Sequence, residues 1–83
     1  VTGKVALVRH EQDGDTHLRL EDGQGHFVVA ECIPVLPCPV VPKAGDTVTV
    51  KGISRHDGEH GWFEVHPVES LRIETPSSSA RPH

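Results

Sequence analysis

Short segments with a two-residue hydrophobic period, separated by turns rich in aspartate and glycine, run the length of this chain. No stretch carries the apolar stripe of an amphipathic helix, and the turns at 12–15, 22–25 and 57–61 have the composition of hairpin turns. The pattern therefore predicts an all-β protein. We expect strands over Thr2–Glu11, Thr16–Glu21, His26–Ile33, Asp46–Arg55 and Trp62–Ile73.

A proline-rich stretch separates the third and fourth expected strands. Its prolines cannot donate to a strand ladder or continue a helix, so we expect an extended connector between 34 and 42. Five short strands with one long connection are typical of a small OB-like Greek-key barrel, with an SH3-like barrel as the second choice. The connector then stands where the OB fold usually has a helix between strands three and four. We assign residues 1–74 to the barrel and 75–83 to a disordered tail or linker, because the serine-rich end has nothing to bury.

The last two expected strands carry three finer predictions. Gly52 interrupts the alternation of the fourth strand and indicates a bulge. In the fifth, Phe63 and Val65 should point inward, and Trp62, Glu64 and His66 outward. Pro67 should break the pairing of that strand, since it has no amide hydrogen to donate.

Size and charge exclude several classes of function. A chain of 83 residues with a net charge of −4 is too small for a large internal cavity and lacks the basic stripe of a general nucleic-acid binder. No apolar run reaches the roughly 18–20 residues of a membrane span, and we expect a soluble chain. Because it begins at Val1 without an initiator Met, we expect a processed product, such as an exported protein, or part of a larger chain. Exposed strand edges near Pro67 would allow a homodimer.

Two resemblances support the barrel. Asp13-Gly14-Asp15-Thr16 resembles a turn of the staphylococcal nuclease family, an OB barrel in which such a turn supplies a carboxylate to calcium. The blocks Val1-Thr2-Gly3-Lys4-Val5, Asp13-Gly14-Asp15-Thr16-His17, Val28-Val29-Ala30-Glu31, Gly45 to Gly52 and His60 to Pro67 are similar to a group of short, uncharacterised bacterial OB-like proteins. This second resemblance covers more of the chain, and it implies a fold without implying a reaction.

Histidine is the most informative residue type. The chain has seven, and His60 and His66 share the outer face of the fifth strand with Trp62 and Glu64. Imidazole and carboxylate groups together suit a divalent transition metal ion. We therefore name as candidate metal ligands His17, His60, Glu64 and His66. The simpler interpretation is a solvated outer face on which Glu64 pairs with Lys51 or Arg55.

Cys32 and Cys38 flank the start of the connector. In an exported protein they would close a small disulfide loop, whereas in a reducing compartment they would remain thiols. Their spacing is not that of a standard zinc knuckle.

No nucleophile elbow, phosphate-binding glycine loop or HExxH motif occurs, so the sequence favours binding over catalysis and yields no catalytic residue. We expect a binding or accessory module whose partner is a small ligand, a metal ion or another protein. Its surface should lie at the first turn and the start of the fifth strand. The expected ligand-binding residues are Asp13, Asp15, His17, Arg19, Trp62 and Glu64.

Three alternatives remain open at this stage. The first is a divalent-metal site within that surface. The second is weak binding of single-stranded nucleic acid, which acidic loops at both ends of the usual OB binding face would oppose. The third is a degenerate nuclease-like hydrolase, for which Asp15 would have to bind calcium.

Overall fold

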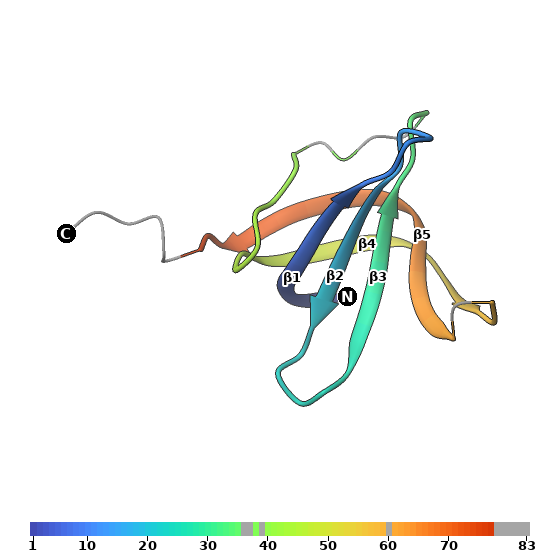
Figure 1. Ribbon diagram of the computed structural model, residues 1–83. Coiled ribbons are helices and arrows are strands. Elements are labelled where there is room, and N and C mark those ends of the chain that lie inside the picture. The colour runs from blue at the N-terminus through green and yellow to red at the C-terminus, as the bar shows by residue number, and fades with distance from the viewer. Residues whose placement is uncertain (36–37, 39, 60, 78–83) are drawn as a thin grey trace.

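Five strands form one closed sheet in the computed structural model, which describes residues 1–35, 38, 40–59 and 61–77. They are β1 (Thr2–His10), β2 (Thr16–Glu21), β3 (Phe27–Cys32), β4 (Thr47–Asp57) and β5 (Trp62–Thr75). The order around the barrel is β1-β2-β3-β5-β4, and β4 pairs back with β1 (Figure 1). The described residues contain no helix, and therefore no helix that is long and apolar enough to cross a membrane. The all-β class and the OB-like barrel are thereby confirmed.

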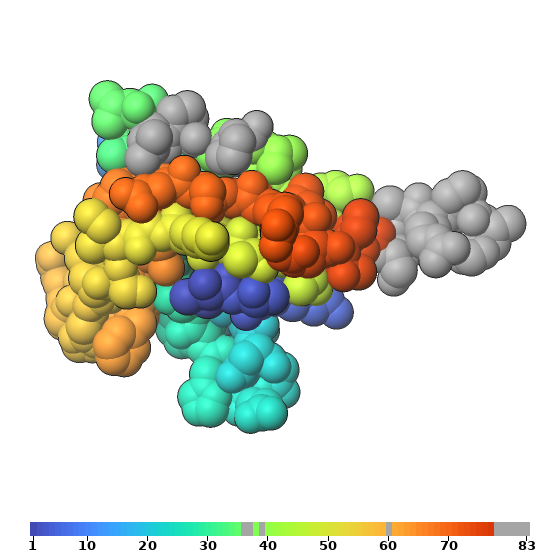
Figure 2. Space-filling view, turned by 180° about the vertical axis from the view of Figure 1, so that it is seen from behind, coloured from blue at the N-terminus to red at the C-terminus, as the bar shows by residue number. Residues whose placement is uncertain are grey.

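Pairing is antiparallel everywhere except between β3 and β5, which run parallel. The view from behind shows β4 and β5 with the start of β1 beside them, and the turn between β2 and β3 projecting beyond the barrel (Figure 2). On the other side β1, β2 and β3 lie next to one another and present an outer surface (Figure 1). The long β4–β5 hairpin extends past one side of the barrel (Figure 1).

Alternation along each strand separates the core from this outer surface. Inward-facing side chains fill the barrel and are almost completely buried. The main members of this core are Val5, Leu18, Leu20, Ala30, Cys32, Val48, Val50, Val65, Val68 and Leu71. Since residues of opposite parity point outward, His17 and Arg19 of β2 and Glu31 of β3 share the outer face.

The structure confirms one prediction for β5 and corrects another. Pairing with β4 is interrupted at Pro67, since Gly52 pairs with Val68 and Ser54 with Val65, although the strand itself continues through this proline. Phe63 is 65% exposed and does not point into the core. It lies in the part of the hairpin beyond the barrel and packs edge-on against His56, with ring centroids 4.9 Å apart. The bulge predicted at Gly52 and the inward position of Val65 are confirmed.

The connector is tied to the barrel at both ends. Cys32, the last residue of β3, forms a disulfide with Cys38, and their Cα atoms are 5.3 Å apart. At the other end Asp46 is 1% exposed and accepts hydrogen bonds from the backbone amides of Lys43 (2.8 Å) and Ser77 (2.6 Å). Thr75 pairs with Thr47, so β5 runs one residue past the expected domain boundary. The rest of the expected tail, 78–83, lies outside the described residues.

Candidate functional site

Two imidazoles and two carboxylates gather on the outer face where β2, β3 and β5 meet. The Nε2 atom of His17 lies 3.0 Å from Oε1 of Glu31, and Nε2 of His66 lies 3.6 Å from the same oxygen. One ligand atom each from Asp15, His17 and Glu31 all lie within 4.8 Å of one another. We call Asp15, His17, Glu31 and His66 the histidine–carboxylate cluster.

Strand pairing explains this convergence. His17 and Glu31 are direct partners in the antiparallel β2–β3 register, so their side chains stand side by side on one face. The parallel β3–β5 ladder pairs Ala30 with Val65, and the residue after each of these is Glu31 and His66. Asp15 immediately precedes β2. Its amide donates a 3.0 Å hydrogen bond to the Asp13 carboxylate, which orders the turn.

The cluster is partly open to solvent. Its central carboxylate, Glu31, is 8% exposed, whereas the side chains of His17 and His66 keep about a quarter of their surface, 25% and 26%. A nearly buried carboxylate requires compensating partners. Both imidazoles serve this purpose, and both remain accessible from outside.

Beside the cluster lies a groove of about 230 Å³ on the same outer face. We call it the aromatic groove, and its lining residues are Leu7, Arg9, His17, Arg19, Phe27, Val29 and Trp62. Phe27 and Trp62 meet edge to face with centroids 6.2 Å apart. The guanidinium carbon of Arg19 lies 3.8 Å from the centre of the Phe27 ring. His17 belongs to both the groove and the cluster, so the two are continuous.

Among the candidate residues, Glu64 differs most from its predicted environment. It is 1% exposed, and neither of its carboxylate oxygens accepts a hydrogen bond from the described residues. Its nearest ionic partner is Arg55, with Nε 3.9 Å from Oε1. Burial therefore overturns the prediction of an exposed outer-face side chain, while the expected pairing with Arg55 is present.

The structure therefore regroups the predicted ligands. Of the four candidate metal ligands, His17 and His66 each contact Glu31, Glu64 does not join them, and His60 lies outside the described residues. Asp15 and Glu31, absent from the predicted metal set, are the residues whose ligand atoms lie close to His17. Glu31 pairs with His17 because the loop between β2 and β3 spans 22–26, one residue more than the predicted 22–25 turn; counting from the shorter turn would have given Ala30 as the partner of His17.

The predicted ligand-binding residues divide in a similar way. His17, Arg19 and Trp62 line the aromatic groove, and Asp15 belongs to the cluster. Asp13 is exposed in the turn, and its carboxylate accepts a hydrogen bond from the backbone amide of Asp15.

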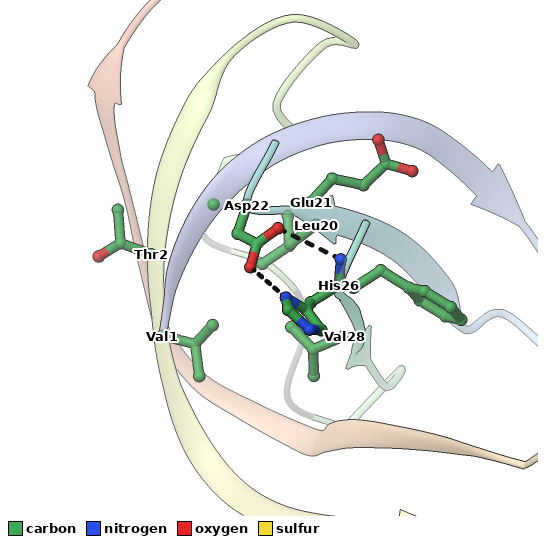
Figure 3. Close-up of a pocket in the computed structure, with 9 residues that line it drawn as sticks. Val1, Thr2, Leu20, Glu21, Asp22, His26 and Val28 are labelled. Carbon is green, nitrogen blue, oxygen red and sulfur yellow. Dashed lines mark hydrogen bonds and ion pairs between the residues drawn. The ribbon is translucent and has the colours of Figure 1, made fainter. Parts of the chain in front are cut away.

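A second imidazole–carboxylate pair lies by another pocket. Figure 3 shows this pocket, of about 190 Å³, with Asp22 and His26 bonded to each other at its edge. Asp22 Oδ2 lies 2.9 Å from Nδ1 of His26, and its Oδ1 accepts the backbone amide of Gln24. That backbone hydrogen bond is the main cause that lowers the pKa of the Asp22 carboxyl below its usual value. Only one histidine takes part, so this pair is a natural reference for the four-residue cluster.

Comparisons with protein-family models, with curated protein sequences and with solved structures yield no match. The resemblances to the staphylococcal nuclease family and to the bacterial OB-like group therefore stay predictions.

Proposed function

We propose that this barrel is a small binding module that holds a divalent transition metal ion at the histidine–carboxylate cluster. The observation that carries the proposal is the convergence of two imidazoles on one oxygen of Glu31, at 3.0 and 3.6 Å, with Asp15 alongside. Ligands about 2.0–2.2 Å from one ion lie about 3–4 Å from each other. The ligand atoms of Asp15, His17 and Glu31 lie within 4.8 Å of one another, close to this range, and His66 approaches the shared oxygen of Glu31 at 3.6 Å. Side-chain rotation would have to bring His66 toward the other two ligands to enclose an ion.

The donor set favours a particular kind of metal. Two nitrogen and two oxygen donors suit zinc and its neighbours in the transition series, whereas calcium prefers oxygen ligands alone. Zn²⁺ is therefore the best single candidate, with His17, His66, Glu31 and Asp15 as the groups that would hold it. The same donor set argues against the calcium-dependent, nuclease-like alternative.

Without a metal the cluster would be a pair of hydrogen bonds between histidines and a carboxylate, with a structural role only. The two cases differ in a measurable way. We would titrate Zn²⁺ into metal-free, untagged protein by calorimetry, and follow Co²⁺ by its visible absorption, whose intensity reports the coordination number. We expect one equivalent of metal to bind, and the substitution His66→Ala to weaken binding at least tenfold.

The control is His26→Ala, which removes an imidazole from the Asp22 pair and leaves the cluster intact. Zinc affinity should not change in this variant. Binding without a defined stoichiometry, or an equal loss of affinity in the two variants, would rule out a metal site at the cluster.

A further inference from the structure

The aromatic groove has the shape and surface to take one flat ring. Leu7 is 54% exposed on β1 and lines the groove together with Val29, and the Phe27 and Trp62 rings line it as well. Its volume of about 230 Å³ is below the roughly 300–1,000 Å³ of pockets for drug-sized ligands. A single ring with one substituent is therefore the largest ligand that it would enclose well.

The charge of the groove is opposite to that of the chain. Two arginines and one histidine line it, and no aspartate or glutamate does, although the chain has twelve acidic residues against eight Lys and Arg. Each of these groups has a glutamate partner outside the lining, so the surroundings are balanced in charge while the lining itself offers N–H donors to an anion.

Both guanidinium groups already have an ion-pair partner, and Arg19 is in addition packed on an aromatic ring. Arg19 donates to Glu21 at 2.9 Å while it covers the Phe27 ring, and Arg9 bonds to Glu11 at 3.0 Å. A guanidinium has five N–H donors, and each of these pairs engages Nε. The terminal nitrogens can therefore bind a ligand carboxylate without loss of the existing pair, and a fixed group loses less entropy on binding.

We propose that the aromatic groove binds a small aromatic carboxylate, with its ring against Phe27 and Trp62 and its carboxylate toward Arg19 and Arg9. The groove shares His17 with the cluster, but this proposal does not require a bound ion. A nucleic-acid strand fits the surroundings less well, because the turn that follows β1 and the turn that precedes Trp62 both carry acidic residues. These residues are Glu11 and Asp13 on the first turn, and Asp57 and Glu59 on the last.

Trp62 is the chain's one tryptophan, so its fluorescence reports on the groove directly. We would titrate metal-free protein with benzoate and compare two matched probes, cyclohexanecarboxylate, which lacks the flat ring, and benzylamine, which reverses the charge. We expect benzoate to shift the emission with a dissociation constant on the order of 1 mM. Each of the other probes should bind at least fivefold more weakly. Equal binding of either probe would overturn the proposal, as would stronger competition from a short oligothymidylate.

Two variants locate the site. Arg19→Gln should weaken benzoate about tenfold, whereas Arg72→Gln should have no effect, because Arg72 makes the same bond to a glutamate two residues on, at 3.0 Å, but lies outside the groove. Leu7→Glu places a carboxylate in the groove at an exposed position, so it should abolish benzoate binding without unfolding the barrel. Equal losses for Arg19→Gln and Arg72→Gln, or full binding by a folded Leu7→Glu variant, would refute the site.

Discussion

The imidazole of His66 lies 3.6 Å from the carboxylate of Glu31, and these side chains come from β5 and β3, the pair of described strands that run parallel. No local feature of the sequence connects the two residues. Barrel closure alone brings them together, and the candidate site is therefore a product of tertiary structure.

Metal and carboxylate binding should be coupled through His17, which belongs to both the cluster and the aromatic groove. A bound Zn²⁺ adds positive charge at one end of the groove, so we expect it to raise the affinity for benzoate about fivefold, and benzoate to raise the affinity for zinc by the same factor. Tryptophan fluorescence titrations with and without zinc measure this. In His66→Ala the metal-free affinity for benzoate should persist while the effect of zinc disappears. A zinc effect that survives this substitution would place the ion elsewhere.

The buried carboxylate of Glu64 should lower the free energy of unfolding. This carboxylate accepts no hydrogen bond from the described residues and is 3.9 Å from Arg55. Replacement of a buried ion pair by apolar side chains of similar size is often neutral or stabilising. We expect Glu64→Met to raise the free energy of unfolding by about 1 kcal/mol, and Arg55→Met, which leaves the carboxylate unpaired, to lower it by about as much. Urea denaturation tests both, and a clear loss of stability in Glu64→Met would show that the charge is needed.

The Cys32–Cys38 disulfide should stabilise the barrel and hold Glu31 in position, because Cys32 is the next residue along β3. A cross-link around so short a loop contributes about 2–3 kcal/mol in the chain-entropy account. Reduction should lower the urea midpoint accordingly and weaken zinc binding. The double variant Cys32→Ala, Cys38→Ala is the control, since a reductant should leave its unfolding curve unchanged.

Asp46 should make stability depend on pH. The backbone amide of Lys43 is the main cause that lowers the pKa of this carboxyl, and the amide of Ser77 adds to it. A lowered folded-state pKa means that the contribution is fully present above the unfolded-state value near 3.9 and is lost as the pH falls through the folded-state value. Asp46→Asn should therefore lower the melting temperature at pH 7 and make little difference at pH 2. An equal loss at both pH values would indicate a role for shape instead of charge.

Gly52 should tolerate no side chain. A Cβ atom there would collide with the carbonyl oxygen of Pro67 and approach Cγ1 of Val65 to 2.8 Å. We expect Gly52→Ala to cost about 3 kcal/mol of unfolding free energy, at the upper end for an overpacked site. Gly58→Ala is the matched control, because nothing lies within 4 Å of its Cβ position. Similar melting temperatures for the two variants would contradict the close approach.

The two-residue hydrophobic period and the composition of the turns predicted the strands well, because each hairpin is a local structure. β2 has the expected bounds, and β4 begins within one residue of them. The interruption of β4–β5 pairing at Pro67 was also predicted, because proline has no amide hydrogen to donate. The prediction for Phe63 was wrong, because this residue lies where the hairpin extends past the core.

The candidate site was only partly predictable for a related reason. His17 and Glu31 share a hairpin, but counting from the predicted 22–25 turn is off by one residue and pairs His17 with Ala30. The position of His66 depends on a parallel ladder that no periodicity encodes. The burial of Glu64 could not be predicted either, because it depends on the tertiary packing around β5.

The β3–β5 ladder joins two halves of the barrel, the β1–β2–β3 meander and the β4–β5 hairpin. This ladder has two register pairs, whereas the β2–β3 ladder has six. Asp15, His17 and Glu31 belong to the first half and His66 to the second. An ion held by all four residues would cross-link the two halves at the β3–β5 ladder. Binding of the ion would then make local opening of this ladder rarer, and hydrogen exchange of the backbone amides in β3 and β5 would measure the change.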